Sequence, residues 1–582
     1  MKADAVSILH LLNGLKQFTV PIYQRTYSWT PKQCEQLWDD IIRAGQNPDI
    51  PGHFVGSIVY IHDGVPLASG IQAFQVIDGQ QRLTTLALLL AALARAARSA
   101  PNTGVNADLI QDEYLTNHYG EGPRHYKLLL TQSDRDTLIS VIEGWPLPPQ
   151  TSQPVIENFE FFQRKVASGA NLATIYEGIG KLLVVQISLD RTQDNPQLIF
   201  ESLNSTGMDL SQADLIRNYI LMGLPGDEQA HLYSQFWYPM EQLFGANYGA
   251  DFDYFMRDYL TVASGAGSIP NIGKVYERFK TYRVDKHSAS ITDLVRDVYD
   301  HAVYYTRLAY QMDPDPEVNA IMRDINTLEA DVTYPFLLEM YADYARERLS
   351  RSDMLALLRL VESYVFRRAI CDIPTNSMNK TFATLMGSVD KSHYRQSVEA
   401  LLLGKTSYRR FPDDDEFRRM FVSRNIYDLT RRRAYLLAKL ENHHHAKEPI
   451  TVKSYTIEHI MPQTPNLPAS WKAMLGPNWQ QVQSTYLHTI GNLTLTGYNP
   501  ELSDHPFLEK RDMAGGFASS PLALNADLAT AEAWNEQAII ARARRLADLA
   551  LQIWARPQLA QAPASAAVIA DEDEEDEEAA SA

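Results

Sequence analysis

The sequence has little cysteine and no long apolar run. Only Cys34 and Cys371 occur among 582 residues, so neither a disulfide framework nor a zinc site of four cysteines can form. The start of the chain lacks the basic and then apolar segments of a secretory signal. The apolar stretch from Leu83 to Ala97 is interrupted by Arg95 and is too short to cross a bilayer. We therefore expect a cytoplasmic protein without a membrane partner.

Positive charge is also scarce. The chain carries 53 Lys and Arg against 71 Asp and Glu, which gives a formal net charge of −18. Eight acidic residues form one run from Asp571 to Glu578, so the rest of the chain carries −10. This balance excludes a uniformly basic nucleic-acid-binding protein. It remains compatible with an enzyme that has a local basic groove for DNA.

The apolar content is sufficient for a sizeable core. Hydrophobic residues make up 45% of the chain, and its length suggests two to four domains. Short apolar runs and an Ala/Leu-rich run predict an α+β N-terminal part, with strands at 54–60, 74–77 and 182–189 and a helix at 83–98. Beyond it we predict helices from 196 to 441, short strands and loops from 451 to 495, a helix from 529 to 555 and a disordered end.

The most specific pattern lies near the C-terminal end. A carboxylate beside a histidine suits metal-assisted hydrolysis of a phosphodiester, because the histidine can activate water while the carboxylate helps to hold a divalent cation. An asparagine can orient the imidazole through a hydrogen bond. An isolated Glu-His pair is usually a surface feature, but three blocks in this order favour a nuclease. The blocks are Glu458 to Pro462 (EHIMP), His488 to Leu495 (HTIGNLTL) and Asn499 to Phe507 (NPELSDHPF), with Lys510 after them.

This segment resembles the HNH, or His-Me finger, nucleases, and most of all the end of GmrSD-type restriction endonucleases. The resemblance implies a ββα-metal unit in which His459 is the general base and Asn492 orients it. It also implies a divalent metal, Mg²⁺ or Mn²⁺. Common HNH enzymes place a histidine at the third position and often carry a CxxC pair, and this sequence has neither. The residues that match the metal positions are Glu458, Asn499 and Asp504, and Lys510 matches a phosphate contact.

A second pattern, Asp78-Gly79-Gln80-Gln81-Arg82, lies between a predicted strand and a predicted helix. Backbone N–H groups at a helix start favour an anion. Arg82 can bind phosphate oxygens through two nitrogens, Asp78 can hold Mg²⁺, and either glutamine can position water. Taken alone, these residues predict a phosphate site or, as the plainer alternative, a turn with Arg82 as a surface charge.

The same string resembles the DGQQR motif of the ParB-like N-terminal domain of the GmrSD type. Further blocks of that domain match residues 20–29, 54–58, 199–207 and 210–218. The resemblance implies that a nucleoside triphosphate, such as GTP or ATP, is bound and hydrolysed. The residues implied in binding are Asp78, Gly79, Gln80, Gln81 and Arg82, with Asp78, Gln81 and Arg82 catalytic.

Two further segments are candidate DNA contacts. An aromatic and polar cluster near the N-terminus suits stacking on a modified base, with a packed core segment as the alternative. The stretch from Tyr408 to Lys439 carries +4 and suits a DNA backbone, unless its arginines pair with the acidic residues at 413–416. The residues expected to contact DNA are Tyr23, Gln24, Arg25 and Trp29 in the first segment, and Arg418, Arg419, Arg431 and Arg432 in the second.

These patterns together predict an α+β protein with four parts. They are a ParB-like nucleotide-hydrolysing and DNA-sensing domain (1–225), a helical connector (226–445), an HNH nuclease domain (446–556) and a disordered acidic tail (557–582). We predict nucleotide-dependent cleavage of foreign or phage DNA according to its modification, by a monomer or a homo-oligomer. Two alternatives stay open: a nuclease or toxin that ignores modification, and a nucleotide-gated DNA-binding regulator with an inactive nuclease.

Overall fold

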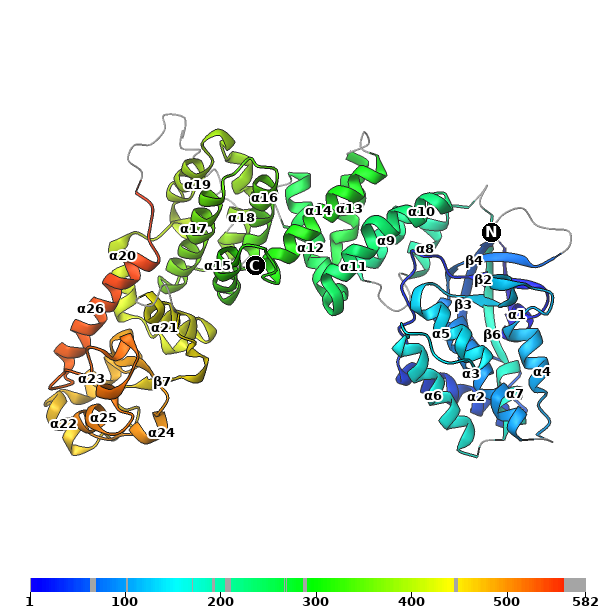
Figure 1. Cartoon of the computed structure of the whole chain (residues 1–582), viewed down its shortest axis with the longest axis horizontal. Coiled ribbons are helices and arrows are strands. Elements are labelled where there is room, and N and C mark those ends of the chain that lie inside the picture. The colour runs from blue at the N-terminus through cyan, green and yellow to red at the C-terminus, as the bar shows by residue number, and fades with distance from the viewer. Residues whose placement is uncertain are drawn as a thin grey trace. The chain divides into compact units, whose positions relative to one another are not determined.

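The computed structural model forms two compact units (Figure 1). Unit 1 comprises residues 1–253 and 288–296, and unit 2 comprises residues 254–287 and 297–582. Helices together with a mixed sheet make the fold class α+β. No helix of the described part of the chain is long and apolar enough to span a membrane. The structure describes residues 2–62, 70–100, 103–169, 171–190, 194–204, 211–265, 267, 269–285, 290–443 and 449–558, so the expected acidic tail lies almost wholly outside the described residues.

Unit 1 contains a six-stranded mixed sheet in the order β1-β6-β3-β4-β2-β5. Strands β3, β4 and β6 confirm the three predicted strands. Strands β1, β2 and β5 were not predicted, because they are short or lack a run of large apolar residues. The strand bounds are β1 Lys2–Ser7, β2 Lys16–Thr19, β3 His53–His62, β4 Gln72–Asp78, β5 Leu128–Leu129 and β6 Leu182–Leu189.

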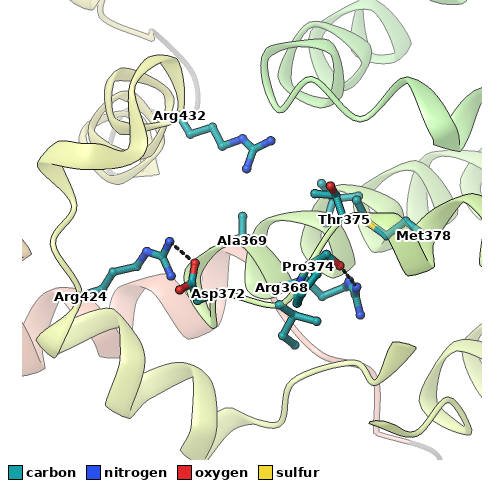
Figure 2. A pocket seen from close by; sticks show the side chains of 10 residues that line it. Arg368, Ala369, Asp372, Pro374, Thr375, Met378, Arg424 and Arg432 are labelled. Atoms are coloured by element: carbon teal, nitrogen blue, oxygen red, sulfur yellow. Dashed lines mark hydrogen bonds and ion pairs between the residues drawn. The ribbon is translucent and has the colours of Figure 1, made fainter. Parts of the chain in front are cut away.

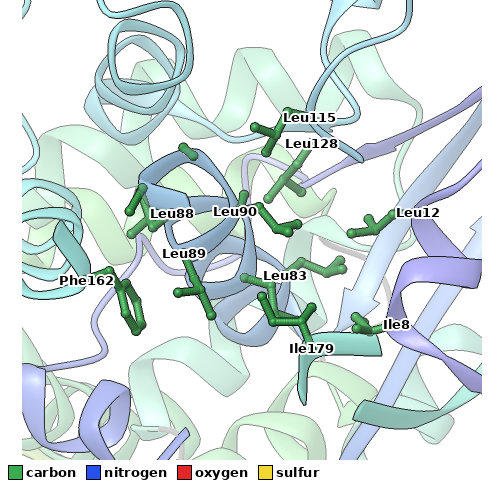
Figure 3. Close-up of a cluster of buried hydrophobic side chains, with 14 of the residues drawn as sticks. Ile8, Leu12, Leu83, Leu88, Leu89, Leu90, Leu115, Leu128, Phe162 and Ile179 are labelled. Carbon is green, nitrogen blue, oxygen red and sulfur yellow. The ribbon is translucent and has the colours of Figure 1, made fainter. Parts of the chain in front are cut away.

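Helix α3 (Gln80–Ser99) is the centre of the unit 1 core. Its Leu88, Leu89 and Leu90 are fully buried although they point in different directions around the helix (Figure 3). A helix that is apolar on all faces is stable only when it is surrounded, which accounts for the Ala/Leu-rich sequence. The other helices up to residue 244 are α1 Ile8–Leu12, α2 Pro31–Gln46, α4 Ala107–Ile110, α5 Gln132–Glu143, α6 Gln153–Ala167, α7 Leu172–Gly180, α8 Pro196–Asn204, α9 Gln212–Leu221, α10 Gly226–Leu232 and α11 Tyr238–Phe244.

The prediction of a nearly all-helical middle part is confirmed for the described residues. The Ser211 hydroxyl caps α9 by accepting from the backbone N–H of Asp214. Helix α17 begins after Ser350, whose hydroxyl accepts from the backbone N–H of Asp353. The helices of this part are α12 Tyr248–Ser264, α13 Val275–Asp285, α14 Ile291–Ala309, α15 Pro316–Thr327, α16 Tyr334–Ala345, α17 Arg351–Ile370, α18 Asn376–Thr384, α19 Tyr394–Leu403, α20 Asp414–Ser423 and α21 Arg431–His443.

The C-terminal part of unit 2 is built on two short strands, β7 (Thr456–His459) and β8 (Leu493–Thr496). The last helix, α26 (Glu536–Ile553), packs against α20 and the Ile490–Asn492 segment. It starts later than the predicted residue 529, because the Asn535 side chain caps it by accepting from the backbone N–H of Ala538. The remaining helices are α22 Ala469–Leu475, α23 Trp479–Tyr486, α24 Asn499–Leu502 and α25 Phe507–Asp512.

Candidate functional site

The first two blocks of the C-terminal motif meet at the β7–β8 pair. Glu458 and His459 end β7, and β8 begins directly after Asn492. The strands are antiparallel, with Glu458 opposite Thr494 and His459 opposite Leu493. All three motif residues are buried. Strand pairing therefore brings together chemistry-bearing residues that lie far apart in the sequence.

His459 is buried and pairs with the partly buried imidazole of His488. Its Nε2 lies 3.0 Å from Nδ1 of His488, and its own Nδ1 is buried with no hydrogen-bond partner among the described residues. Burial, assisted by the nearby side chains of His488 and Lys510, lowers the pKa of His459 to about 3. His459 is therefore neutral near pH 7, which is the form that can accept a proton.

Two residues without a predicted role, His488 and Tyr427, complete this cluster. The Tyr427 ring stacks on His488 with centroids 5.4 Å apart, and it lies 4.9 Å from the ring of His459. The guanidinium of Arg433 lies 4.1 Å from the Tyr427 ring centroid. His488 opens the second sequence block, so its place in the motif was an available signal. Tyr427 precedes the motif, and only the fold brings it to His459.

Glu458 and Lys510 form a buried ion pair beside these rings. Lys510 Nζ lies 2.6 Å from Glu458 Oε1 and donates to the carbonyl oxygens of His459 and Ile460 at 3.3 Å. Burial raises the pKa of Glu458 and lowers that of Lys510. The predicted contact between Lys510 and a DNA phosphate is corrected by this placement, because the fully buried ammonium group is already engaged.

Asn492 holds the chain that follows β7. Its Oδ1 accepts from the backbone N–H of Met461 at 2.8 Å and from Trp534 Nε1 at 3.2 Å. Its Nδ2 donates to the carbonyl oxygens of Met461 and Leu487. Among its contacts in the described part of the chain, none joins its side chain to the imidazole of His459. The Asn492 side chain therefore acts on the backbone that follows His459 and not on its ring.

Helix α26 fixes the segment that carries Asn492. Arg542 Nη1 donates to the carbonyl oxygens of Ile490, Gly491 and Leu493 at 2.8–3.2 Å. A Cβ atom at Gly491 would lie 2.4 Å from the carbonyl oxygen of Ile539 in α26. The glycine of the motif is therefore required by the close approach of this helix.

The predicted metal donors are not assembled as a ligand set. Glu458 is engaged by Lys510, and Asn499 Nδ2 donates to the Ile457 carbonyl at 2.8 Å. Asp504 is exposed. No group of three or more His, Cys, Asp or Glu side chains among the described residues is placed to hold a metal ion. Since a divalent cation needs available oxygen ligands, the predicted set does not fit one in this arrangement.

The DGQQR residues lie where β4 meets α3. Gly79 has a φ of +96°, which glycine tolerates, and Gln80 begins the helix. Arg82 Nη1 lies 3.9 Å from Asp78 Oδ2 and donates to the Ser57 carbonyl at 3.1 Å. Burial raises the pKa of Asp78, and the charge of Arg82 opposes this effect. Asp78 and Arg82 are therefore neighbours at the helix start, and both side chains are partly exposed.

The two glutamines of this motif hold a neighbouring segment. Gln80 Nε2 donates to the Arg25 carbonyl at 2.9 Å. Gln81 is buried, and its Oε1 accepts from the backbone N–H of Ser28 at 2.9 Å while its Nε2 donates to the Thr26 carbonyl. Their amide groups are thus used internally, which favours a positioning role over direct contact with a nucleotide.

The predicted aromatic cluster near the N-terminus is mostly internal. Tyr23 and Gln24 are buried, and Gln24 Nε2 donates to two backbone carbonyls of β4 at 2.8 Å. Trp29 packs against the core, and Arg25 is partly exposed. The expectation that Tyr23 and Gln24 contact DNA is corrected, because both side chains face the interior of unit 1. Arg25 and Trp29 stay candidates.

The predicted arginines of the basic stretch differ in their partners. Arg418 and Arg431 pair with acidic side chains that lie far away in the sequence. Local pairing, the alternative from the sequence, occurs for Arg410 through Glu416. Within the described part of the chain, neither Arg419 nor Arg432 forms an ion pair.

Two family models match the chain. The model for the N-terminal domain of GmrSD restriction endonucleases matches residues 8–221, and the model for their C-terminal domain matches residues 411–549. The first range contains the DGQQR residues, and the second contains all three blocks of the C-terminal motif together with Tyr427. No curated protein matches the chain. The two domains occur in the family's order, and the chain therefore belongs to the GmrSD restriction endonucleases, which are DNA endonucleases of restriction defence.

Proposed function

We propose that this endonuclease hydrolyses the DNA phosphodiester at the end of β7, with His459 as the general base. The observation that carries the proposal is the neutral, buried His459, whose Nε2 is held by His488 while Nδ1 has no partner among the described residues. When the ring proton of His459 is on Nε2, this N–H donates a hydrogen bond to Nδ1 of His488. The lone pair on Nδ1 of His459 can then accept a proton from water.

The surrounding groups keep this base in position. Tyr427 packs on both imidazoles, and Asn492 fixes the backbone after His459. The family suggests a divalent metal, Mg²⁺ or Mn²⁺, but the predicted donors do not form a ligand set, so every role in this proposal belongs to a protein group. The nuclease domain proposed from the sequence, residues 446–556, is extended by Tyr427 and Arg433.

We further propose that the DGQQR segment binds the phosphates of a nucleoside triphosphate, GTP or ATP. The support is the partly exposed Asp78–Arg82 pair at the start of α3, where backbone N–H groups favour an anion. Gln80 and Gln81 hold the Arg25 to Ser28 segment against this site. In this proposal residues 1–225 couple hydrolysis to detection of the DNA modification, and residues 226–445 connect that domain to the nuclease.

Plasmid nicking by His459→Ala tests the nuclease proposal. Loss of a general base lowers the rate by about 10²–10⁴-fold. His505→Ala is the matched control, because His505 is a partly exposed histidine of the same region that pairs with Glu509. A His459→Ala enzyme that nicks at the wild-type rate would remove His459 from this role.

The sensing proposal is tested with plasmids that differ only in modification, with and without GTP or ATP. We expect the cleavage rate to depend on the DNA modification and on the presence of the nucleotide. Equal rates on all plasmids would favour the nuclease that ignores modification. Undiminished phage protection by His459→Ala would favour the regulator with an inactive nuclease.

A further inference from the structure

A pocket of about 420 Å³ lies in unit 2, where the end of α17 and the start of α18 face the basic stretch. Arg368, Arg424 and Arg432 line it, and Asp372 is the one carboxylate among its lining residues (Figure 2). The pocket therefore has a formal excess of positive charge. None of these residues belongs to the C-terminal motif or to DGQQR.

Arg368 is built into the wall of this pocket. It is 1% exposed, and its two terminal nitrogens donate to the carbonyl oxygens of Tyr408 and Pro374 at 2.6 and 2.9 Å. Its Nε is buried without a hydrogen-bond partner among the described residues. Within the described part of the chain Arg368 forms no ion pair, and a buried charge without a countercharge is costly, so an anion in the pocket would stabilise this guanidinium by its charge.

The other two arginines differ in how far they are engaged. Arg424 donates to Asp372 at 2.7 Å and to the Ile370 carbonyl at 3.0 Å. Arg432 extends from α21 into the space beside Ala369 (Figure 2), and it forms no ion pair within the described part of the chain. Asp372 thus offsets Arg424, while Arg368 and Arg432 supply positive charge that no ion pair within the described residues compensates.

We propose that this pocket binds a phosphoryl group, independently of the nuclease site and of the DGQQR segment. The planar guanidinium matches pairs of phosphate oxygens. Arg432 can move toward such a ligand without breaking an ion pair, and the guanidinium of Arg368, held in the wall by backbone carbonyls, adds a second positive charge. The phosphoryl group comes either from a DNA backbone or from a free nucleotide, and binding measurements separate these sources.

The experiment uses the full chain in EDTA, so that binding is measured without cleavage. Anisotropy of a fluorescein-labelled DNA duplex and calorimetry with GTP and with inorganic phosphate are compared for wild type, Arg432→Ala and Ala369→Glu. Arg359→Ala is the control, because it removes the same charge from an exposed arginine of α17 that pairs with Glu317 outside the pocket. The GTP titrations are repeated with Arg82→Ala present in every protein.

We expect Arg432→Ala and Ala369→Glu to lower affinity for one of the probes about tenfold, with Arg359→Ala close to wild type. If the probe is the duplex, the slope of log affinity against log salt falls by about 1 for Arg432→Ala, and the source is the DNA backbone. If only GTP or phosphate binding falls, the source is a free nucleotide.

The proposal is overturned if Arg432→Ala binds all three probes with wild-type affinity, or if Arg359→Ala loses as much affinity as Arg432→Ala. Melting temperatures establish that each variant is folded, and if Ala369→Glu is not, Arg432→Ala alone decides. Because no readout depends on cleavage, failure of the pocket leaves the role of His459 untouched.

Discussion

The side chains around His459 form two pairs of different electrostatic character. In the His459–His488 pair, burial lowers the pKa of His459, so this imidazole is neutral near pH 7. The Glu458–Lys510 pair keeps two charges in the interior by placing them 2.6 Å apart. Adjacent residues of one motif thus meet different requirements, which are the proposed proton acceptance at His459 and a paired buried charge at Glu458.

Lys510→Met should destabilise the protein strongly, because it leaves the Glu458 carboxylate buried without its partner. Removal of one member of a buried ion pair costs about 3–5 kcal/mol. The double variant Glu458→Leu/Lys510→Met should be more stable than Lys510→Met alone. Melting temperatures of both variants check this. Equal temperatures for the single and double variants would show that the pair is not coupled.

His459→Gln should weaken the dependence of stability on acid. The pKa of His459 is about 3 in the folded protein against an ordinary value of 6.5. Between these pH values the unfolded chain binds more protons at His459 than the folded protein does. The contribution of neutral His459 to the free energy of unfolding is therefore present above about pH 6.5 and is lost as pH falls toward 3. Wild type should lose about 2 kcal/mol from this residue between pH 7 and pH 5, and the variant should not.

Calorimetric melting at both pH values measures this difference. His505→Gln serves as the control, because its side chain is substantially exposed. If the melting temperature falls equally in wild type and His459→Gln between pH 7 and pH 5, the lowered pKa of His459 is contradicted.

At the scale of elements, short strands hold the site and helices hold the strands. The β7–β8 pair spans few residues, and a pair of this length is not stable by itself. Helix α26 supplies the missing support, because Arg542 binds the carbonyls that flank Asn492. In unit 1, Asp78 and Arg82 are held side by side at the start of α3. The burial of this helix keeps its start in place.

Gly491→Ala should destabilise the protein by about 1–3 kcal/mol, because the new methyl group collides with backbone that cannot move aside easily. The collision is with the Ile539 carbonyl of α26. Gly497→Ala is the matched control, since a Cβ atom there meets no atom within 4 Å. Thermal melting of the two variants gives the comparison, and a loss no larger for Gly491→Ala than for Gly497→Ala would refute close packing of α26.

At the scale of the whole molecule, the candidate sites belong to different units. The DGQQR residues lie in unit 1 and His459 lies in unit 2, and the two family models match separate parts of the chain. Residues 222–410 lie between the matched ranges and are helical in their described parts. Each site therefore has its own supporting core.

Single substitutions should separate the two proposed activities. His459→Ala should abolish nicking and leave nucleotide hydrolysis unchanged, because the DGQQR residues lie in unit 1 and His459 lies in unit 2. Arg82→Ala should abolish hydrolysis, because it removes the cation beside Asp78. Phosphate release and plasmid nicking are measured on the same preparations. Unchanged hydrolysis by Arg82→Ala would show that the nucleotide site lies elsewhere.

Much of the local structure could be predicted from neighbouring residues. The strand at Leu182–Leu189 and the helix over 83–98 follow from apolar patterns within single segments. The Ser211 cap follows from one hydroxyl three residues before a backbone N–H group. The start of α26 was predicted too early, since Ala-rich sequence extends beyond the residue that caps the helix.

The sequence by itself determined the family motifs, their order and the identity of His459 as the candidate base. Only the tertiary structure decided the partners of those residues: His488 and Tyr427 beside His459, Lys510 against Glu458, and Gln81 turned toward the Arg25 to Ser28 segment. The physical reason is that a polar side chain takes its burial, charge environment and hydrogen bonds from segments far away in the chain. Spacing within a motif does not specify those segments.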